Sequence, residues 1–109
     1  MLDTVEIVAT VERLESELVD LGIRGLRAVG PQHLAALQSL HEELQRIGAD
    51  HLAGRIEFLV SAIRADDREA AVALLRTQAS LRVFERVLTL QAVGEILEQM
   101  VEPPDEEGS

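Results

Sequence analysis

Residues 67–101 contain no proline and a single glycine, Gly94. Proline and glycine are the residues that most often interrupt or end a helix. A continuous helix of about 35 residues would be about 50 Å long, because each residue adds about 1.5 Å. The two helical stretches that precede it reach only about 25 Å by the same rise. We therefore expect a long C-terminal helix that extends beyond its neighbours.

Apolar residues occupy two sides of this predicted helix. At about 100° per residue, one group gathers on one side and comprises Leu74, Leu81, Phe84, Leu88 and Ala92. A second group falls nearly opposite and comprises Val72, Ala79, Val83, Val87, Leu90, Leu97 and Val101. A surface helix needs only one apolar stripe, so two stripes predict contact in two directions.

The two stripes could be covered either within a monomer or between two chains. Within a monomer, the N-terminal helix and the hairpin before residue 65 would cover them near Val83 and Leu88, but not near the C-terminal end. Soluble monomers rarely leave a sizeable apolar patch in water. We therefore predict an isologous homodimer in which the long helices of two chains pack antiparallel. The predicted interface residues are Val83, Val87, Leu90, Leu97 and Val101.

A strict heptad seam runs through residues 3–22, where a first helix is predicted. Its apolar residues are spaced four and three apart, as in helices that pack along one side, and they are Ile7, Val11, Leu14, Leu18 and Leu21. This seam is a second candidate for the dimer interface. Gly22, Gly25 and Gly30 bracket the connection that follows, which has room for a short helical turn.

Local signals delimit the middle of the chain. Pro31 is predicted to be the first residue of a second helix, and Gly48 to end it in the left-handed conformation. Asp50 is predicted to cap a third helix, and Asp66 and Glu69 have the spacing of a capping box at the fourth. The loop after the second helix is short, so these two helices should form an antiparallel hairpin. Their apolar faces comprise Leu34, Leu37, Leu40, Leu44 and Ile47, and then Leu52, Ile56, Leu59 and Ile63.

The predicted fold class is all-α, an up-down bundle of about four helices with a long C-terminal helix. Residues 1–101 are expected to form one helical domain. Residues 102–109 are acidic and contain two prolines, so we expect a disordered tail.

The charge balance argues against several partners. The formal net charge is −10, and all ten basic residues are arginine. An acidic surface opposes binding to phosphates, so nucleic acid is an unfavoured partner. No apolar run approaches the length of a membrane span and no secretory signal pattern is present, so a soluble, cytoplasmic protein is expected. The absence of cysteine fits a reducing compartment.

Candidate catalytic and metal-ligating residues are few. The three histidines, His33, His41 and His51, have no carboxylate three residues earlier, so the Glu-x-x-His pair of di-iron bundles is missing. We expect His41 to be partly buried and hydrogen-bonded, and the other two to lie near helix starts, neutral. No nucleophile arrangement or phosphate loop is present. No catalytic residue, metal or cofactor is therefore predicted, and the protein is interpreted as a non-enzyme.

A set of short motifs over residues 22–90 resembles a bacterial group of proteins. The motifs are Gly25-Leu26-Arg27, Gly30-Pro31, His33-Leu34, Leu37, Leu40, Leu44, Gly48, Leu52-Ala53 and Leu59. The chain is similar in these positions to uncharacterised helical proteins encoded near bacterial SWIM zinc-finger proteins. The resemblance implies an accessory or scaffolding role and assigns no active residue. The chain departs from any zinc-finger pattern in having no cysteine.

Three functions remain open from the sequence. The leading one is a bacterial adaptor or assembly subunit that binds protein and self-associates by helical packing. The first alternative is a regulatory or nucleic-acid-binding module that uses Arg24, Arg27, Arg76, Arg82 and Arg86. The second is an enzyme with a site near His41 and its neighbours Glu42 and Glu43.

Overall fold

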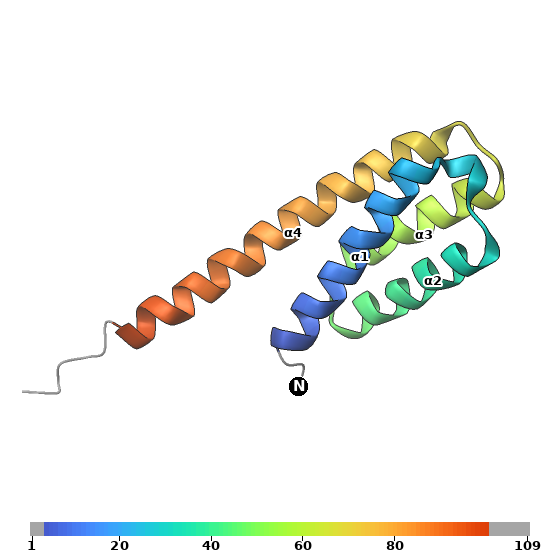
Figure 1. Ribbon diagram of the computed structural model, residues 1–109. Coiled ribbons are helices and arrows are strands. Elements are labelled where there is room, and N and C mark those ends of the chain that lie inside the picture. The colour runs from blue at the N-terminus through green and yellow to red at the C-terminus, as the bar shows by residue number, and fades with distance from the viewer. Residues whose placement is uncertain (1–3, 101–109) are drawn as a thin grey trace, which may run out of the picture.

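The computed structural model describes residues 4–100 and consists of helices in that range. Figure 1 shows successive long helices running in opposite directions, with α4 extending past the other three. In chain order the elements are α1 (Thr4–Arg24), the 3₁₀ turn η1 (Leu26–Ala28), α2 (Pro31–Arg46), α3 (Asp50–Arg64) and α4 (Glu69–Met100). The predicted all-α fold of four helices with a long C-terminal helix is thus confirmed. The predicted tail, 102–109, and the end of the predicted domain at 101 lie outside the described residues.

The heptad seam of α1 faces into the chain's own bundle. Val11, Leu14, Leu18 and Leu21 are all buried in the single core, while Ile7 is only partly buried. Neighbouring helices α2 and α4 both contact α1. The seam is therefore occupied within one chain, and the prediction that it is also available for a dimer interface is wrong for these four residues.

Helix α1 is longer than its glycine pattern predicts. It continues through Gly22 to Arg24, whose guanidinium lies 3.3 Å from the Asp20 carboxylate one turn earlier. The helix ends where Gly25 adopts a φ of +92° and its N–H donates to the Leu21 carbonyl at 2.9 Å. A positive φ costs glycine little, so Gly25 stops the helix, and Gly22, in regular helical backbone, does not. The short helical turn expected in this connection is η1.

The α2–α3 hairpin forms as predicted around Pro31 and Gly48. Pro31 occupies the first turn of α2, and Gly48 has a φ of +85° directly after it. The Ala49 N–H then donates to the Leu44 carbonyl at 2.8 Å, which satisfies one of the last carbonyls of α2. Asp50 is not the cap of α3: Ala49 holds that position, without a side-chain hydrogen bond, and Asp50 is the first helical residue. A carboxylate there still interacts favourably with the helix dipole.

The start of α4 uses a different carboxylate from the predicted one. Asp67 Oδ1 accepts a hydrogen bond from the Glu69 N–H at 3.0 Å. Asp66 has a φ of +52° and its N–H donates to the Ile63 carbonyl, so it belongs to the end of α3. Aspartate tolerates this left-handed conformation better than most residues. The predicted capping box is therefore wrong by one residue, because Asp66 is needed to end the preceding helix.

Helix α4 is continuous through Gly94 and about twice as long as α3. Its 32 residues span about 48 Å, whereas the 15 residues of α3 span about 22 Å. The last buried side chain of α4 is Leu81, and Phe84 and Leu88 pack against the core more loosely. The described part of the chain accordingly measures 66 × 23 × 20 Å. None of its helices is long and apolar enough to cross a membrane.

Candidate protein-binding surface

The first half of α4 turns one side toward the bundle. This side carries residues that pack on α3 and, less extensively, on α1, and it consists of Ala70, Ala73, Leu74, Thr77 and Leu81, followed by the half-buried Phe84 and Leu88. These include four of the five residues of the first predicted stripe. That stripe is therefore part of the core, and Ala92, its fifth member, is partly buried.

The second half of α4 carries polar residues on the same side. Gln91, Glu95, Glu98 and Gln99 continue the direction of the core-facing side at about 100° per residue, and all four are exposed. Because this side becomes polar, it offers α1 and α3 no apolar surface to pack against. The bundle therefore ends near Leu88, although the helix continues.

The apolar residues of the second half point the other way. We call them the outer face of α4, and they are Leu90, Val93, Ile96, Leu97 and Met100. Their mean direction lies about 150° from that of the core-facing side when 3.6 residues make one turn. Leu90, Val93, Leu97 and Met100 are spaced three, four and three residues apart, which is a heptad seam. The first half of α4 is thus apolar on its core-facing side and also exposes Val72 and Leu75 on the other side, whereas the second half is apolar mainly on the outer face.

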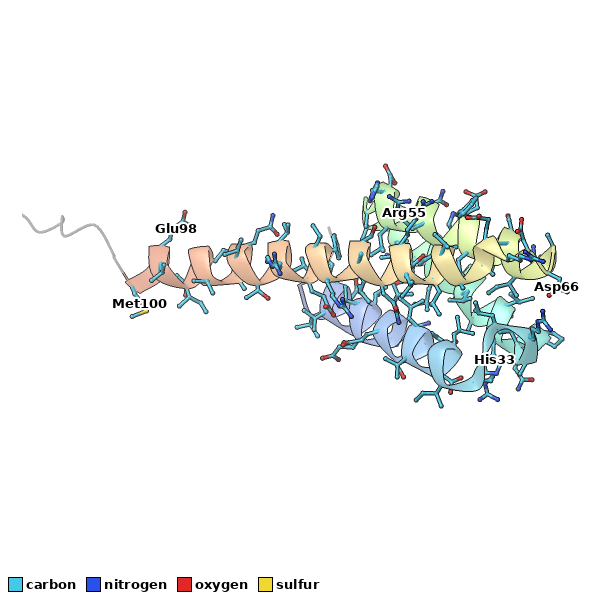
Figure 2. All side chains as sticks on the ribbon, turned by 90° about the horizontal axis from the view of Figure 1, so that it is seen from above. His33, Arg55, Asp66, Glu98 and Met100 are labelled. Carbon is cyan, nitrogen blue, oxygen red and sulfur yellow. The ribbon has the colours of Figure 1, made fainter. Side chains whose placement is uncertain are left out.

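The outer face is open to solvent in the single chain. Leu90 is 65% exposed, Leu97 51% and Met100 74%, whereas Leu81 in the bundle is 3% exposed. Figure 2 views α4 from above and shows its projecting half, toward Glu98 and Met100, without another helix beside it. Such a continuous apolar surface is typical of a protein-binding site.

The structure brings four of the five predicted interface residues to one connected surface. Val83 and Val87 lie on α4 where it leaves the bundle, and Leu90 and Leu97 belong to the outer face. Val83 is 60% exposed, so the expectation that the monomer covers it is wrong. Its direction falls between the core-facing side and the outer face. Val101 lies outside the described residues.

Val93 was not among the predicted interface residues. It is half exposed and lies between Leu90 and Leu97 on the outer face. The heptad spacing of Leu90, Val93, Leu97 and Met100 is visible in the sequence and would have identified it.

An apolar groove lies beside the start of the projecting half. It has a volume of about 310 Å³ between the α2–α3 connection and α4, and its lining residues are Gly48, Ala49, Asp50, His51, Leu52, Val83, Phe84 and Val87. Val83 and Val87 therefore border both this groove and the outer face. The groove and the outer face form one surface along α4.

Two carboxylates, Glu15 on α1 and Glu85 on α4, lie close together between these two helices. Burial raises the pKa of Glu85, and the charge of Glu15 on α1 and a hydrogen bond with it raise that pKa further. Arg82, one turn earlier on α4, acts in the opposite direction. This contact therefore favours a protonated Glu85 and weakens the attachment of α4 to α1 when both groups are charged.

The three histidines do not converge. His41 is buried on α2, as predicted, but neither ring nitrogen has a hydrogen-bond partner within residues 4–100, so the expected hydrogen bond is absent. Its Nε2 lies 3.8 Å from the Glu57 carboxylate, and the predicted neighbours Glu42 and Glu43 are not its partners. His33 Nδ1 lies 3.7 Å from Asp20 and His51 lines the groove. Among the described residues, no group of three or more acidic or histidine side chains could hold a metal ion.

The arginines of the nucleic-acid alternative are divided among three elements. Arg24 on α1 pairs with Asp20, Arg27 lies in η1, and the other three are exposed on α4. Arg82 also lies near the Glu85 carboxylate. Two of the five arginines thus lie beside carboxylates, which reduces the positive potential that a phosphate would meet.

Comparison of the chain with family models, with curated proteins and with solved structures finds no match. The surface of α4 is therefore interpreted from its own chemistry.

Proposed function

We propose that this protein is a non-enzymatic, self-associating subunit that binds a second copy of itself through the outer face of α4. The observation that carries the proposal is that the apolar residues of the second half of α4 gather on the side away from the bundle and are exposed. A helix that only completed its own bundle would keep its apolar residues on the side that faces α1 and α3. Within residues 4–100 the outer face points away from every other helix, which supports coverage by another molecule.

The apolar area is large enough to support association. Covering about 400 Å² at about 25 cal/mol per Å² corresponds to about 10 kcal/mol, from which the entropy cost of association is subtracted. With Val83 and Val87 included, two chains together can bury on the order of 1,000 Å², which reaches the range of specific interfaces.

The second copy is the partner that this surface fits best. The outer face is a heptad seam, and such a seam packs against another seam of the same spacing. Every chain carries one, and a two-fold axis allows the same patch to be used by both chains. The accessory or scaffolding role that the sequence resemblance implies remains a prediction about what the dimer serves.

The direct test measures the molar mass of the full chain by light scattering over a concentration series. The wild-type chain is expected to form a dimer. Leu90→Asp is expected to weaken dimerisation at least about 100-fold, because each of two symmetric sites loses an apolar contact and buries a charge. Its helicity, measured by circular dichroism, should be nearly unchanged since Leu90 is exposed in the single chain.

Gln91→Asp is the matched control. It introduces the same charge one residue away, on the polar side of α4, and is expected to leave the dimer intact. A wild-type chain that remains monomeric at high concentration would overturn the proposal. Equal weakening by both variants would show that charge, and not the outer face, controls association.

A further inference from the structure

We infer that in this dimer the last turn of one α4 lies over Val83 and Val87 of the other, at the mouth of the groove beside the α2–α3 connection. This inference rests on the proposed self-association and adds its direction and register. The two α4 helices run antiparallel, with the two-fold axis between Leu90 and Val93. Each chain thereby contributes Met100 to the partner's groove.

The spacing of the apolar residues sets this register. Val83 and Met100 are separated by 17 residues, or about 26 Å along the helix. When Leu90 faces the partner's Val93 in an antiparallel pair, Val83 faces the partner's Met100 at the same time. All the exposed apolar residues from Val83 to Met100 are then covered, and no apolar residue of the outer face extends past the overlap.

The groove supplies the shape for this contact. Its apolar lining includes Leu52 from α3 and Val83, Phe84 and Val87 from α4. The chain's own Met100 lies about 24 Å farther along α4 than Phe84, so it cannot reach the groove. The partner's Met100 can. Methionine is unbranched and flexible, which suits it to an irregular apolar opening.

The charges of α4 favour the antiparallel direction. Arg82 and Arg86 are exposed at the groove end. The other half of α4 carries Glu95 and Glu98 and no arginine. An antiparallel pair places arginines beside the acidic end of the partner. A parallel pair would place arginines beside arginines, and acidic ends beside each other, which is unfavourable for a chain of net charge −10.

Disulfide cross-linking tests this register, because the chain contains no cysteine and only introduced thiols can react. Val83→Cys and Met100→Cys chains are mixed in reductant and then oxidised. The mixture is expected to form the mixed Val83–Met100 disulfide as its main covalent dimer, identified by mass spectrometry. The Val83→Cys chain alone should form at least about 5-fold less, because antiparallel pairing separates its two thiols by about 26 Å, far beyond the reach of a disulfide.

Glu98→Cys is the matched control for Met100→Cys. Glu98 is also exposed in the last turns of α4, but it lies on the polar side, so its mixture with Val83→Cys should cross-link poorly. If Val83→Cys cross-links to itself and the mixture yields no mixed Val83–Met100 disulfide, the dimer is parallel and the inference is overturned. If the chain dimerises and neither combination cross-links, the register is wrong. A monomeric wild-type chain overturns the proposed self-association itself, which light scattering reports independently.

Discussion

His41 shows how a single side chain can depart from its sequence-based interpretation. It is 8% exposed on the core side of α2, one turn from the buried Leu37 and Leu44. The sequence pattern places a polar residue on an apolar stripe but does not supply a partner. In the structure Glu57 is 3.8 Å from Nε2, too far for a hydrogen bond. The ring is therefore a buried polar group that lowers stability.

Replacing His41 by leucine should stabilise the protein. His41→Leu removes a polar group that has no hydrogen-bond partner within residues 4–100 and retains a side chain of similar size. We expect the free energy of unfolding to rise by about 1–2 kcal/mol, measured by urea denaturation at fixed protein concentration. His51→Leu, at an exposed position, is the control and should change it by less than about 0.5 kcal/mol. A loss of stability in His41→Leu would show that the imidazole has a partner in solution.

Thr77 is also a buried polar residue, but unlike His41 it has hydrogen-bond partners. Its hydroxyl is fully buried between α3 and α4, 2.8 Å from the Ala73 carbonyl and 3.3 Å from the Arg55 carbonyl. A threonine that bonds back to its own helix is common. This geometry lets a polar residue occupy the centre of the α3–α4 contact without an unpaired donor.

At the scale of helices, the contact between α1 and α4 includes a repulsive pair. Glu85 has a raised pKa through burial and its proximity to Glu15. A group whose folded-state pKa is raised contributes stability below its unfolded pKa, near 4.3, and that contribution is lost as the pH rises through the folded-state pKa. The α1–α4 contact should therefore be weakest near neutral pH.

The Glu85→Gln variant tests whether the charge of Glu85 makes the stability of the protein depend on pH. At pH 7 it should raise the melting temperature by about 1–3 °C, because it removes one charge of the pair, and the small size reflects solvent screening at a partly exposed site. Near pH 4 the difference from the wild type should disappear. Glu15→Gln should give a similar rise, and the double variant should not exceed the two single effects added together. A Glu85→Gln difference that is independent of pH would contradict this account.

Helix α4 explains why some elements were predicted better than others. Its existence and approximate length follow from the lack of proline between 67 and 101, whereas its continuity past Gly94 was left open by the sequence and is seen only in the structure. The stops at Gly25 and Gly48 are local conformational events, but the sequence alone did not distinguish Gly25 from Gly22 as the end of α1. The capping residues at Asp50 and Asp66 were wrong by one position, since adjacent residues can compete for the same role and the path of the loop decides between them.

At the scale of the whole molecule, the bundle and the projecting half of α4 are separable. The core consists of residues from Val11 to Leu81, with Phe84 and Leu88 packed against it. Beyond Leu88 the described chain consists only of the rest of α4, which contains no buried residue. The bundle should therefore fold without the outer face.

Truncation after Leu88 tests this division. The chain 1–88 is expected to remain helical and to melt within about 5 °C of the wild-type monomer, because it loses no buried side chain of the described structure. It should be monomeric by sedimentation, since the outer face has been removed. The Leu90→Asp variant is the appropriate reference for its stability, as it keeps the full length without the dimer. A truncated chain that still dimerises would place the interface on the bundle.

The helical class, the four helices and the long reach of α4 were determined by the sequence alone, because they depend on local preferences and on the periodicity of apolar residues. Which of its two apolar sides α4 buries was decided only by the tertiary structure. The α1 seam and the outer face of α4 are both heptad patterns, yet the first is inside the bundle and the second is outside. The reason is geometric: α1 lies alongside other helices over most of its length, whereas α4 continues after its neighbours have ended.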